Sequence, residues 1–597
     1  MILETIKTAK DIKKLNIKEL TLLCEEIRQE IISTVSLNGG HLSSNLGSVE
    51  LIVALYYVFD FPNDKLIFDV GHQCYAHKIL SGRLEKFSTI RKCDGLSGFP
   101  DTTESEYDAF TVGHAGTSIS AGLGYAYSRD KLKEDYFIIN FVGDASIFNG
   151  ENLESITANE VKPKKFIVIL NDNGMSININ NNGLYKIVSK ITVKKRYNNF
   201  NNFLSRTIGK SFIGKFLRAI KRVLKRSLSL NTITDSIGLK YVGVFDGHNL
   251  KMLINILKDI KESQNPTILH AKTIKGKGLE VAENDATKFH GVSKEFKGSN
   301  NHFSNSVSDI LEEVYAENNN ITAITAGMKE GTGLTNFANN HPNSFVDVGI
   351  AEEYAVTLSA GMALGGIKPI VFIYSTFLQR AYDQTLHDVC LQNLPVIFCV
   401  DRSGVVGSDG KTHQGVFDIS YLTHIPNLTV ISPKNSEELK LAILTALKLN
   451  SPVAIKYPNG NYSDVKTKTP LSLPLNWEVL DDGDDNVILA VGPRMIDLAK
   501  QVNKKLSKKA TIVNARVIKP LDKEYLLKIK DKNIITLEEN VKRGGFGSSV
   551  LEFYNENNVK ADVSILSIKD NFVKHATTSE QLLDNGLTVE NVMSLIK

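Results

Sequence analysis

The sequence lacks the features that would mark a secreted or disulfide-stabilised protein. It has only five cysteines in 597 residues, and they form no Cys-x-x-Cys pair and no zinc-spaced group with histidine. We expect them to be reduced thiols of a cytoplasmic protein. The first residues mix acidic and basic side chains and contain no apolar core, so we do not expect them to form a secretory signal.

Long apolar runs and a strong net charge are also missing. No uninterrupted apolar stretch approaches the roughly 20 residues that a membrane-spanning helix needs. The formal net charge is only +4, from 70 basic and 66 acidic side chains. We therefore expect neither a nucleic-acid nor a membrane partner. A globular chain of this length is expected to form about three to four domains.

One segment departs from this balance of charge. Residues 186–231 are rich in lysine, arginine, asparagine and serine and contain no acidic residue. Within it, residues 210–230 have amphipathic spacing with basic side chains on the polar side. A helix of this kind can bind an anionic membrane surface. A long insertion with a solvated basic face is the simpler interpretation.

Apolar runs elsewhere predict parallel α/β sheets. Residues 136–142 and 165–170 have the pattern of buried strands, and residues 151–159 between them that of a helix. Such a βαβ unit presents ligands at the carboxyl ends of its strands. Regular structure is expected to resume near 238–245. Further strands are expected at 321–326, 370–374, 396–401, 429–432, 487–491, 510–514, 533–537 and 562–568.

The fold class is therefore predicted to be α/β, with three domains that each contain a mainly parallel sheet flanked by helices. The polar stretch 297–302 has the composition of a linker, and Pro470 and Pro474 bracket a second boundary. The predicted domains are 1–302, which includes the basic insertion, 303–475 and 476–597.

Hard oxygen ligands follow two consecutive predicted strands. Gly143-Asp144-Ala145-Ser146 follows the first strand, and Asn171-Asp-Asn173-Gly-Met175 follows the second. A carboxylate and an amide oxygen suit magnesium, which readily shares phosphate oxygens. A helix starting near Asn149 could add N-terminal amides to such a site.

This spacing is similar to the magnesium-diphosphate motif of thiamine-diphosphate enzymes. The resemblance implies that Asp144 and Asn173 bind the metal through side-chain oxygens, and Met175 through its backbone carbonyl. Ala145 stands where the family has a second glycine. Its methyl group is expected to crowd the diphosphate or to restrict the turn, without removing a ligand.

A second motif, Asp347-Val-Gly-Ile-Ala-Glu352-Glu353, resembles the activating-glutamate motif of the same enzymes. The resemblance implies that Glu352 hydrogen-bonds the aminopyrimidine of the cofactor. The cofactor would carry the difficult chemistry, and the protein would position it and control its protonation. Two adjacent glutamates alone would more often form a solvated helix face.

Further strings resemble the 1-deoxy-D-xylulose 5-phosphate synthase family, in order from about residue 30 to beyond 540. They include the segments around His41, His72, His114, His290, Tyr374 and Asp401. The resemblance implies a transketolase-like fold and a homodimer. It also implies a transferase that condenses pyruvate with D-glyceraldehyde 3-phosphate and releases CO2. The product, 1-deoxy-D-xylulose 5-phosphate, is a precursor of isoprenoids, thiamine and pyridoxal.

The same resemblance assigns expected roles to individual residues. The catalytic residues would be Glu352, His41, His72, His290 and His413. The cofactor-binding residues would be His72, Gly113, His114, Ala115, Asp144, Ala145, Ser146, Asn173, Lys275, Leu279, Glu352 and Phe377. The substrate-binding residues would be Tyr374, Arg380, Arg402, Asp409 and Asn459. Imidazole suits proton handling near neutral pH.

The sequence departs from the family at several of these positions. Glu353 and Tyr354 replace the usual glutamine and histidine, which would put an extra carboxyl and a phenol beside the activating position, and Leu279 replaces an aromatic residue. Asn459 stands where the family has an arginine expected to bind the acceptor's phosphate with Arg402. Losing that contact would cost roughly 1.5–3 kcal/mol. We therefore hypothesise weaker binding of glyceraldehyde phosphate, or a different acceptor.

Three alternatives stay open at this point. A paralogous transferase would decarboxylate pyruvate but use another aldehyde. A transketolase would lack the synthase-like strings at Tyr374 and Asp401. A catalytically weak or membrane-associated relative would explain Ala145 and the basic insertion, but it would not explain the retained Asp144, Asn173 and Glu352.

Overall fold

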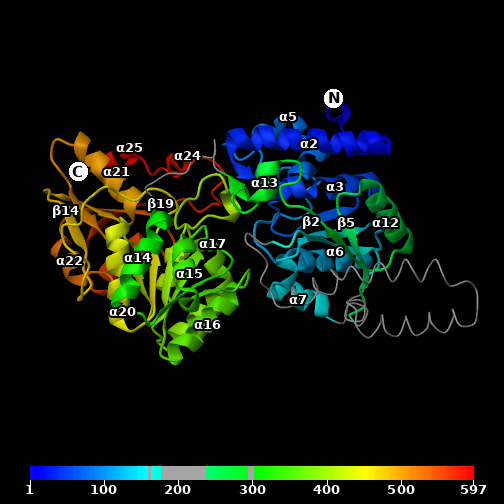
Figure 1. The fold of residues 1–597 in the computed structure, drawn as a ribbon. Helices are drawn as coiled ribbons and strands as arrows, with labels where there is room; N and C mark the ends of the chain where they lie inside the picture. The colour runs from blue at the N-terminus through cyan, green and yellow to red at the C-terminus, as the bar shows by residue number, and fades with distance from the viewer. Residues whose placement is uncertain (159–162, 176–236, 293–301) are drawn as a thin grey trace, which may run out of the picture. The chain divides into compact units, whose positions relative to one another are not determined.

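A computed structural model describes residues 1–158, 163–175, 237–292 and 302–597 (Figure 1). The chain divides into two compact units. The first contains residues 1–90 and 95–296, and the second contains residues 91–94 and 297–597. The predicted basic insertion lies outside the described residues.

The first unit is built around a five-stranded sheet in which all neighbouring strands are parallel. The strand order is β2-β3-β4-β6-β5. The strands are β2 (Lys65–Phe68), β3 (Ile138–Gly143), β4 (Phe166–Asp172), β5 (Lys240–Asp246) and β6 (Thr267–Lys272). The helices are α1 (Ala9–Ile12), α2 (Ile17–Asn38), α3 (Ser43–Val58), α4 (Tyr75–Lys78), α5 (Leu84–Phe87), α6 (Ser118–Leu132), α7 (Gly150–Thr157), α12 (Leu250–Ser263) and α13 (Glu280–Asn284).

Both faces of this sheet are covered, which explains why its strands are apolar throughout. In β3, Ile139 and Phe141 belong to the core formed with α2, α3 and α12. Ile138 and Val142 face the opposite way and pack with residues of α6. A separate antiparallel pair, β1 (Gly40–His41) and β7 (Gly291–Val292), joins two segments far apart in the sequence.

The second unit contains a seven-stranded sheet and a five-stranded sheet. The first has the order β17-β12-β13-β11-β10-β8-β9, with β8 (Ile321–Thr325), β9 (Phe345–Asp347), β10 (Lys368–Tyr374), β11 (Ile397–Asp401), β12 (Thr429–Ile431), β13 (Val453–Lys456) and β17 (Val517–Lys519). The second has the order β14-β16-β15-β18-β19, with β14 (Glu478–Asp481), β15 (Asn486–Ala490), β16 (Thr511–Asn514), β18 (Asn533–Val541) and β19 (Asp562–Ile568). The helices are α14 (Phe303–Glu317), α15 (Thr335–Asn340), α16 (Glu352–Leu364), α17 (Ser375–Leu378), α18 (Tyr382–Gln384), α19 (Asp418–Thr423), α20 (Ser436–Leu449), α21 (Pro493–Lys505), α22 (Lys523–Lys528), α23 (Phe546–Glu556), α24 (Thr578–Asp584) and α25 (Val589–Met593).

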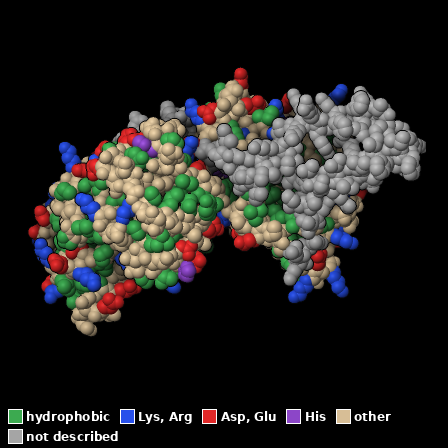
Figure 2. All heavy atoms as spheres, turned by 60° about the horizontal axis from the view of Figure 1, so that its bottom comes forward, with side chains coloured by type: hydrophobic (Ala, Val, Ile, Leu, Met, Phe, Trp, Pro, Cys, Tyr) green, Lys and Arg blue, Asp and Glu red, His purple; other side chains and the backbone are tan. Residues whose placement is uncertain are grey.

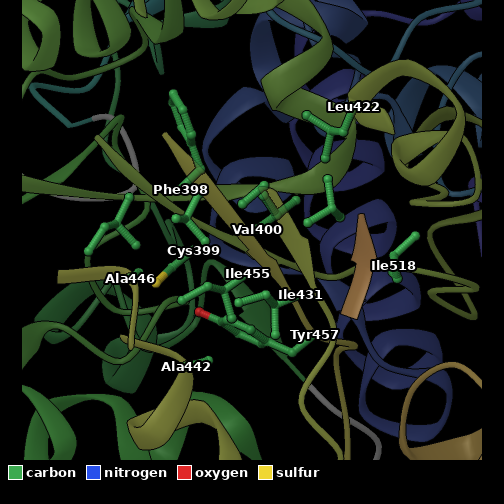
Figure 3. Close-up of a cluster of buried hydrophobic side chains, with 14 of the residues drawn as sticks. Phe398, Cys399, Val400, Leu422, Ile431, Ala442, Ala446, Ile455, Tyr457 and Ile518 are labelled. Atoms are coloured by element: carbon green, nitrogen blue, oxygen red, sulfur yellow. The ribbon is translucent and has the colours of Figure 1, made fainter. Parts of the chain in front are cut away.

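Strand β17 connects the two predicted C-terminal domains through strand pairing. It follows β16 in the chain but pairs antiparallel with β12, at the edge of the seven-stranded sheet. Figure 3 shows Ile518 of β17 in one buried cluster with Ile431 of β12 and Ile455 of β13. The predicted boundary at 475 and 476 therefore separates two sheets but not two independent cores. The three-domain division itself stays a prediction.

The predicted α/β class is confirmed, because the sheets are mainly parallel and flanked by helices. All the predicted strands form, with ends shifted by up to a few residues. In the part of the chain that the structure describes, no helix is both long and apolar enough to cross a membrane. Figure 2 shows acidic and basic side chains interspersed on the described surface of one face, consistent with the small net charge.

Candidate active site

Asp144 and Asn173 follow the carboxyl ends of adjacent parallel strands, as predicted. Strand β3 ends at Gly143, which is in register with Asn171 of β4. Asp144 is buried, and its backbone N–H donates to the carbonyl of Asn171 at 3.3 Å. The two predicted metal ligands therefore lie at the same edge of one sheet.

The turn after β4 is held by hydrogen bonds within it. Oδ1 of Asp172 accepts from the N–H of Gly174 at 3.0 Å, and Oδ1 of Asn173 accepts from the N–H of Met175 at 3.1 Å. Gly174 has φ +75°, a conformation that suits glycine. These bonds give Asn173 and Met175 defined positions.

Two consecutive hydrogen bonds, which the sequence did not predict, hold the carboxyl of Asp172 in place. Oδ2 of Asp172 lies 2.8 Å from Nε2 of His270, and Nδ1 of His270 lies 2.6 Å from the hydroxyl of Tyr241. The three groups come from three neighbouring strands, β4, β6 and β5. A single histidine inside a strand carries no local signal of such a role.

Ala145 does not restrict the turn after β3. Its backbone has φ −77° and ψ −38°, which any residue can adopt. The family's glycine is therefore not required by the backbone here, and the expected restriction of the turn is wrong. Ser146, the next residue, is buried.

Lys275 is a buried amine close to Asp144. Burial lowers its pKa to about 8, and the negative charge of Asp144 partly opposes this shift. The loop that carries it is tied to the start of α3, because the N–H of Gly276 donates to the carbonyl of Ser43 at 2.7 Å. Leu279 is half-buried and packs against the core of this unit.

The three histidines of the first unit that are predicted to be catalytic form a cluster. The ring centroids of His41, His72 and His290 are separated by 5.5 Å (His41–His72), 5.6 Å (His41–His290) and 5.3 Å (His72–His290). Pairing of β1 with β7 brings His41 and His290 together. Nδ2 of Asn45 donates to the carbonyls of His41 and His72 at 2.7 and 2.8 Å, which fixes the two segments to each other.

Desolvation determines the protonation of His290. Its pKa lies well below the ordinary value for histidine, and the nearby positive charge of Lys275 lowers it further. A neutral imidazole at pH 7 can accept a proton or donate a hydrogen bond. His290 can therefore take part in proton transfer.

Asp69 organises the loop that carries Gly113, His114 and Ala115. Its Oδ1 accepts from the N–H of Gly116 at 2.9 Å, and its Oδ2 accepts from the N–H of Ser118 at 3.1 Å. Asp69 lies just beyond β2, so this loop meets the same sheet edge as Asp144. The carboxylate thereby holds the predicted cofactor-binding loop at that edge.

In the second unit, Glu352 is the first residue of α16 and is buried. Burial raises the pKa of its carboxyl to about 7, and the charge of Arg380 opposes this shift. Oε2 of Glu352 makes no hydrogen bond within the described part of the chain. Tyr354 is 57 % exposed, so the expectation that its phenol lies beside the Glu352 carboxyl is wrong.

Three other predicted residues of the second unit, Phe377, His413 and Arg402, gather around Tyr374. The ring of Phe377 stacks on that of Tyr374 at a centroid distance of 5.6 Å, and the ring of His413 meets Phe377 edge-on at 5.6 Å. The guanidinium of Arg402 lies 3.7 Å from the Tyr374 centroid. Tyr374 and Asp401 end adjacent strands in register, which places Arg402 beside the ring.

Asp409 pairs with an arginine that the sequence did not single out. Nη2 of Arg91 lies 2.8 Å from Oδ1 of Asp409 and also donates to Oγ of Ser408 at 2.8 Å. Arg91 is more than 300 positions away in the chain, in the short segment 91–94 that packs with the second unit. Burial lowers the pKa of the neighbouring His413.

Asn459 accepts a hydrogen bond from another arginine that the sequence did not single out. Nη2 of Arg494 donates to the carbonyl of Asn459 at 2.5 Å. Position 459 therefore has a guanidinium beside it, although its own side chain is uncharged.

Family models match the chain in three consecutive segments. The model of 1-deoxy-D-xylulose-5-phosphate synthase matches residues 3–273. The models of the transketolase pyrimidine-binding domain and C-terminal domain match residues 301–464 and 475–592. Among solved structures, a Campylobacter jejuni transketolase aligns with 97% of this chain and 99% of its own at 17% identity, with a TM-score of 0.41, too low to support a conclusion.

Curated relatives match over nearly the whole chain. A 1-deoxy-D-xylulose-5-phosphate synthase of Clostridium tetani is 44% identical, covering 99% of this chain and 98% of the relative. Proteins of the same name from Clostridium kluyveri and Carboxydothermus hydrogenoformans are also 44% identical. They cover 100% and 99% of this chain, and 99% and 98% of their own lengths. The chain therefore belongs to the 1-deoxy-D-xylulose-5-phosphate synthase family.

Proposed function

We propose that this protein condenses pyruvate with D-glyceraldehyde 3-phosphate, releases CO2 and forms 1-deoxy-D-xylulose 5-phosphate, an isoprenoid precursor. The observation that carries this proposal is the full-length match, at 44% identity, to relatives named for that activity. The alternative of a paralogue with another acceptor is not favoured, because relatives that carry this name match nearly the whole chain.

The family depends on thiamine diphosphate, and the residues of this chain fit that cofactor. Oε2 of Glu352 is a buried oxygen without a hydrogen bond among the described residues, and the pKa of its carboxyl is about 7. Such a group can share a proton with a ring nitrogen of an aminopyrimidine. When bound, the cofactor supplies a carbanion-like carbon that attacks the keto group of pyruvate.

We assign the diphosphate end of the cofactor and a magnesium ion to the first unit. Asp144 and Asn173 offer oxygen ligands at one sheet edge, and Met175 offers its carbonyl. The buried amine of Lys275 would add a positive charge for the diphosphate. Gly113, His114, Ala115, Ala145, Ser146 and Leu279 keep their expected roles as cofactor contacts.

The histidines would handle protons and substrate oxygens. The rings of His41, His72 and His290 are close enough together to contact one substrate molecule. Because burial keeps His290 neutral at pH 7, it can take a proton from the reacting groups. His413 has a lowered pKa for the same reason and would act in the second unit.

Acceptor binding would depend on the cluster around Tyr374. The guanidinium of Arg402 is held against the Tyr374 ring and by Asp401 at 3.2 Å. A guanidinium fixed in this way can bind a phosphate without losing much conformational freedom. Arg380 and Asp409 would complete the substrate pocket.

We further propose a homodimer. Helix α16 exposes Tyr354 (57 %) and Leu364 (66 %), and Leu391 nearby in the same unit is 67 % exposed. Large apolar side chains on a surface often mark an interface. Sedimentation equilibrium should give twice the chain mass, and Leu364→Asp should shift the protein towards the monomer.

The test of the proposed reaction supplies pyruvate, thiamine diphosphate and Mg²⁺, with and without D-glyceraldehyde 3-phosphate, and identifies the product by mass. Acceptor-dependent formation of 1-deoxy-D-xylulose 5-phosphate is expected. Release of CO2 with no five-carbon product would instead indicate another acceptor, and no reaction would indicate an inactive relative.

A further inference from the structure

The turn that carries Arg402 and the turn that carries Asn459 lie side by side. Strands β11 and β13 are parallel neighbours, with Val400 in register with Lys456. Just beyond the strands, the N–H of Ser403 donates to the carbonyl of Tyr457 at 3.0 Å. Side chains from both turns can therefore reach one ligand at this sheet edge.

The guanidinium of Arg494 joins these two turns. Its Nη1 donates to the carbonyl of Val405 at 3.0 Å, and its Nη2 donates to the carbonyl of Asn459 at 2.5 Å. A Cβ built on Gly460 would come within 3.4 Å of the same Nη2. Arg494 thus comes from the start of α21, but its charge lies at the turn of Asn459.

Glu539 orients this guanidinium. Its Oε2 lies 2.8 Å from Nη1 of Arg494 and also accepts from the N–H of Val405 at 3.2 Å. These contacts account for three of the five guanidinium N–H donors. Among the residues that the structure describes, Nε and the second hydrogen of Nη2 have no hydrogen-bond acceptor. The side chain of Arg494 is 16 % exposed, so part of it is open to solvent.

His302 lies within range of the charges of both arginines. It pairs with Asn461 in an antiparallel bridge beside the Asn459 turn. Besides burial, the positive charges of Arg402 and Arg494 both lower the pKa of its imidazole, and a hydrogen bond with the Asn459 side chain opposes this shift. The charges of both guanidiniums therefore act on the region beside the Asn459 turn.

We propose that Arg494 is a specificity-determining residue that binds the phosphate of the aldehyde acceptor together with Arg402, in place of an arginine at position 459. This inference rests on the proposed function, and it replaces the hypothesis that the enzyme binds the phosphorylated acceptor weakly. A guanidinium binds phosphate through two parallel N–H donors, and its origin in another part of the chain does not alter that chemistry.

The experiment compares two acceptors that differ only in the phosphate, D-glyceraldehyde 3-phosphate and D-glyceraldehyde. Arg494→Gln removes the positive charge and leaves a neutral side chain that can still donate a hydrogen bond. We expect it to raise the KM for the phosphorylated acceptor about ten- to a hundredfold. The KM for D-glyceraldehyde and the kcat with either acceptor should stay close to those of the wild type.

A rescue variant distinguishes phosphate binding from support of the turns. Adding Asn459→Arg to Arg494→Gln returns a guanidinium to the same place from the other turn. Most of the increase in the KM for D-glyceraldehyde 3-phosphate should then be reversed. Lys500→Gln is the matched control, because Lys500 lies on the same helix and pairs with Asp481 at 2.7 Å, away from both turns. Lys500→Gln should leave the KM for D-glyceraldehyde 3-phosphate and the KM for D-glyceraldehyde unchanged.

Two results would overturn the proposal. An equal loss with both acceptors, or no recovery in the double variant, would mean that Arg494 only clamps the turns. A wild-type enzyme that makes no product from either aldehyde would instead refute the proposed function, and the role of Arg494 with it. Product formation by the wild type therefore separates failure of the function from failure of this assignment.

Discussion

Nη1 of Arg380 lies 4.0 Å from Oε2 of Glu352, too far for a hydrogen bond. The charge of Arg380 therefore stabilises the ionised carboxyl only in part, and burial still raises the pKa of Glu352 to about 7. This arrangement leaves Glu352 able both to hold and to release a proton near neutral pH. That property is what activation of an aminopyrimidine requires.

Glu352→Gln should abolish most of the activity without unfolding the protein. The amide cannot exchange a proton with the cofactor, so kcat should fall by about a hundred- to ten-thousandfold. Glu353→Gln is the control, because it removes the adjacent carboxyl on the same helix turn. An unchanged kcat in Glu352→Gln would remove this residue from the mechanism.

The same carboxyl should make stability depend on pH. Glu352 titrates near pH 7 in the folded protein and near 4.5 in the unfolded chain, so the folded protein binds more protons between these values. The stabilising contribution of Glu352 to the free energy of unfolding is fully present below about pH 4.5 and is lost as the pH rises through about 7.

Cofactor-free Glu352→Gln should therefore gain stability relative to the wild type as the pH rises from about 5 to about 8, by roughly 2–4 kcal/mol. Urea unfolding of both proteins across this range measures the difference. Asp401 and Glu538 also have raised pKa values, but they titrate in both proteins and cancel. Parallel pH profiles would contradict the prediction.

Asp144→Asn should weaken magnesium binding. The variant loses a negative oxygen ligand, so the Mg²⁺ concentration for half-maximal activity should rise at least about tenfold. Calorimetric titration of Mg²⁺ with thiamine diphosphate gives a readout independent of turnover. Asp246→Asn, at the end of β5 in the same sheet, should bind normally; equal affinities for all three proteins would exclude Asp144 as a ligand.

A buried ion network should contribute to the stability of the second unit. Nζ of Lys434 lies 2.7 Å from Glu438 and 2.6 Å from Glu478, and all three side chains are buried. Lys434→Met would leave two buried carboxylates with one cation, Arg516, which lies 2.9 Å from Glu438, and should cost about 3–5 kcal/mol of unfolding free energy. Lys440→Met removes a more exposed pair with Glu313 and should cost no more than about 1 kcal/mol. Similar losses in chemical denaturation would contradict this ranking.

Local sequence patterns predict part of this structure well. The sequence predicts β3, β4 and the polar residues that follow them, because apolar runs and their ends are local features. Strand β17 has only three residues, and its pairing with β12 depends on contacts made far along the chain. Arg91, His270 and Arg494 act through partners distant in sequence, so no spacing rule identifies them.

The central claim is that the two-carbon fragment of pyruvate is transferred to D-glyceraldehyde 3-phosphate. Carbon-13 NMR with pyruvate labelled at its keto carbon and its methyl carbon follows both atoms. The account predicts acceptor-dependent appearance of the labels at the ketone and the terminal methyl of 1-deoxy-D-xylulose 5-phosphate. Labels that stay in pyruvate, or that leave only as acetaldehyde or acetate when the acceptor is present, would contradict it.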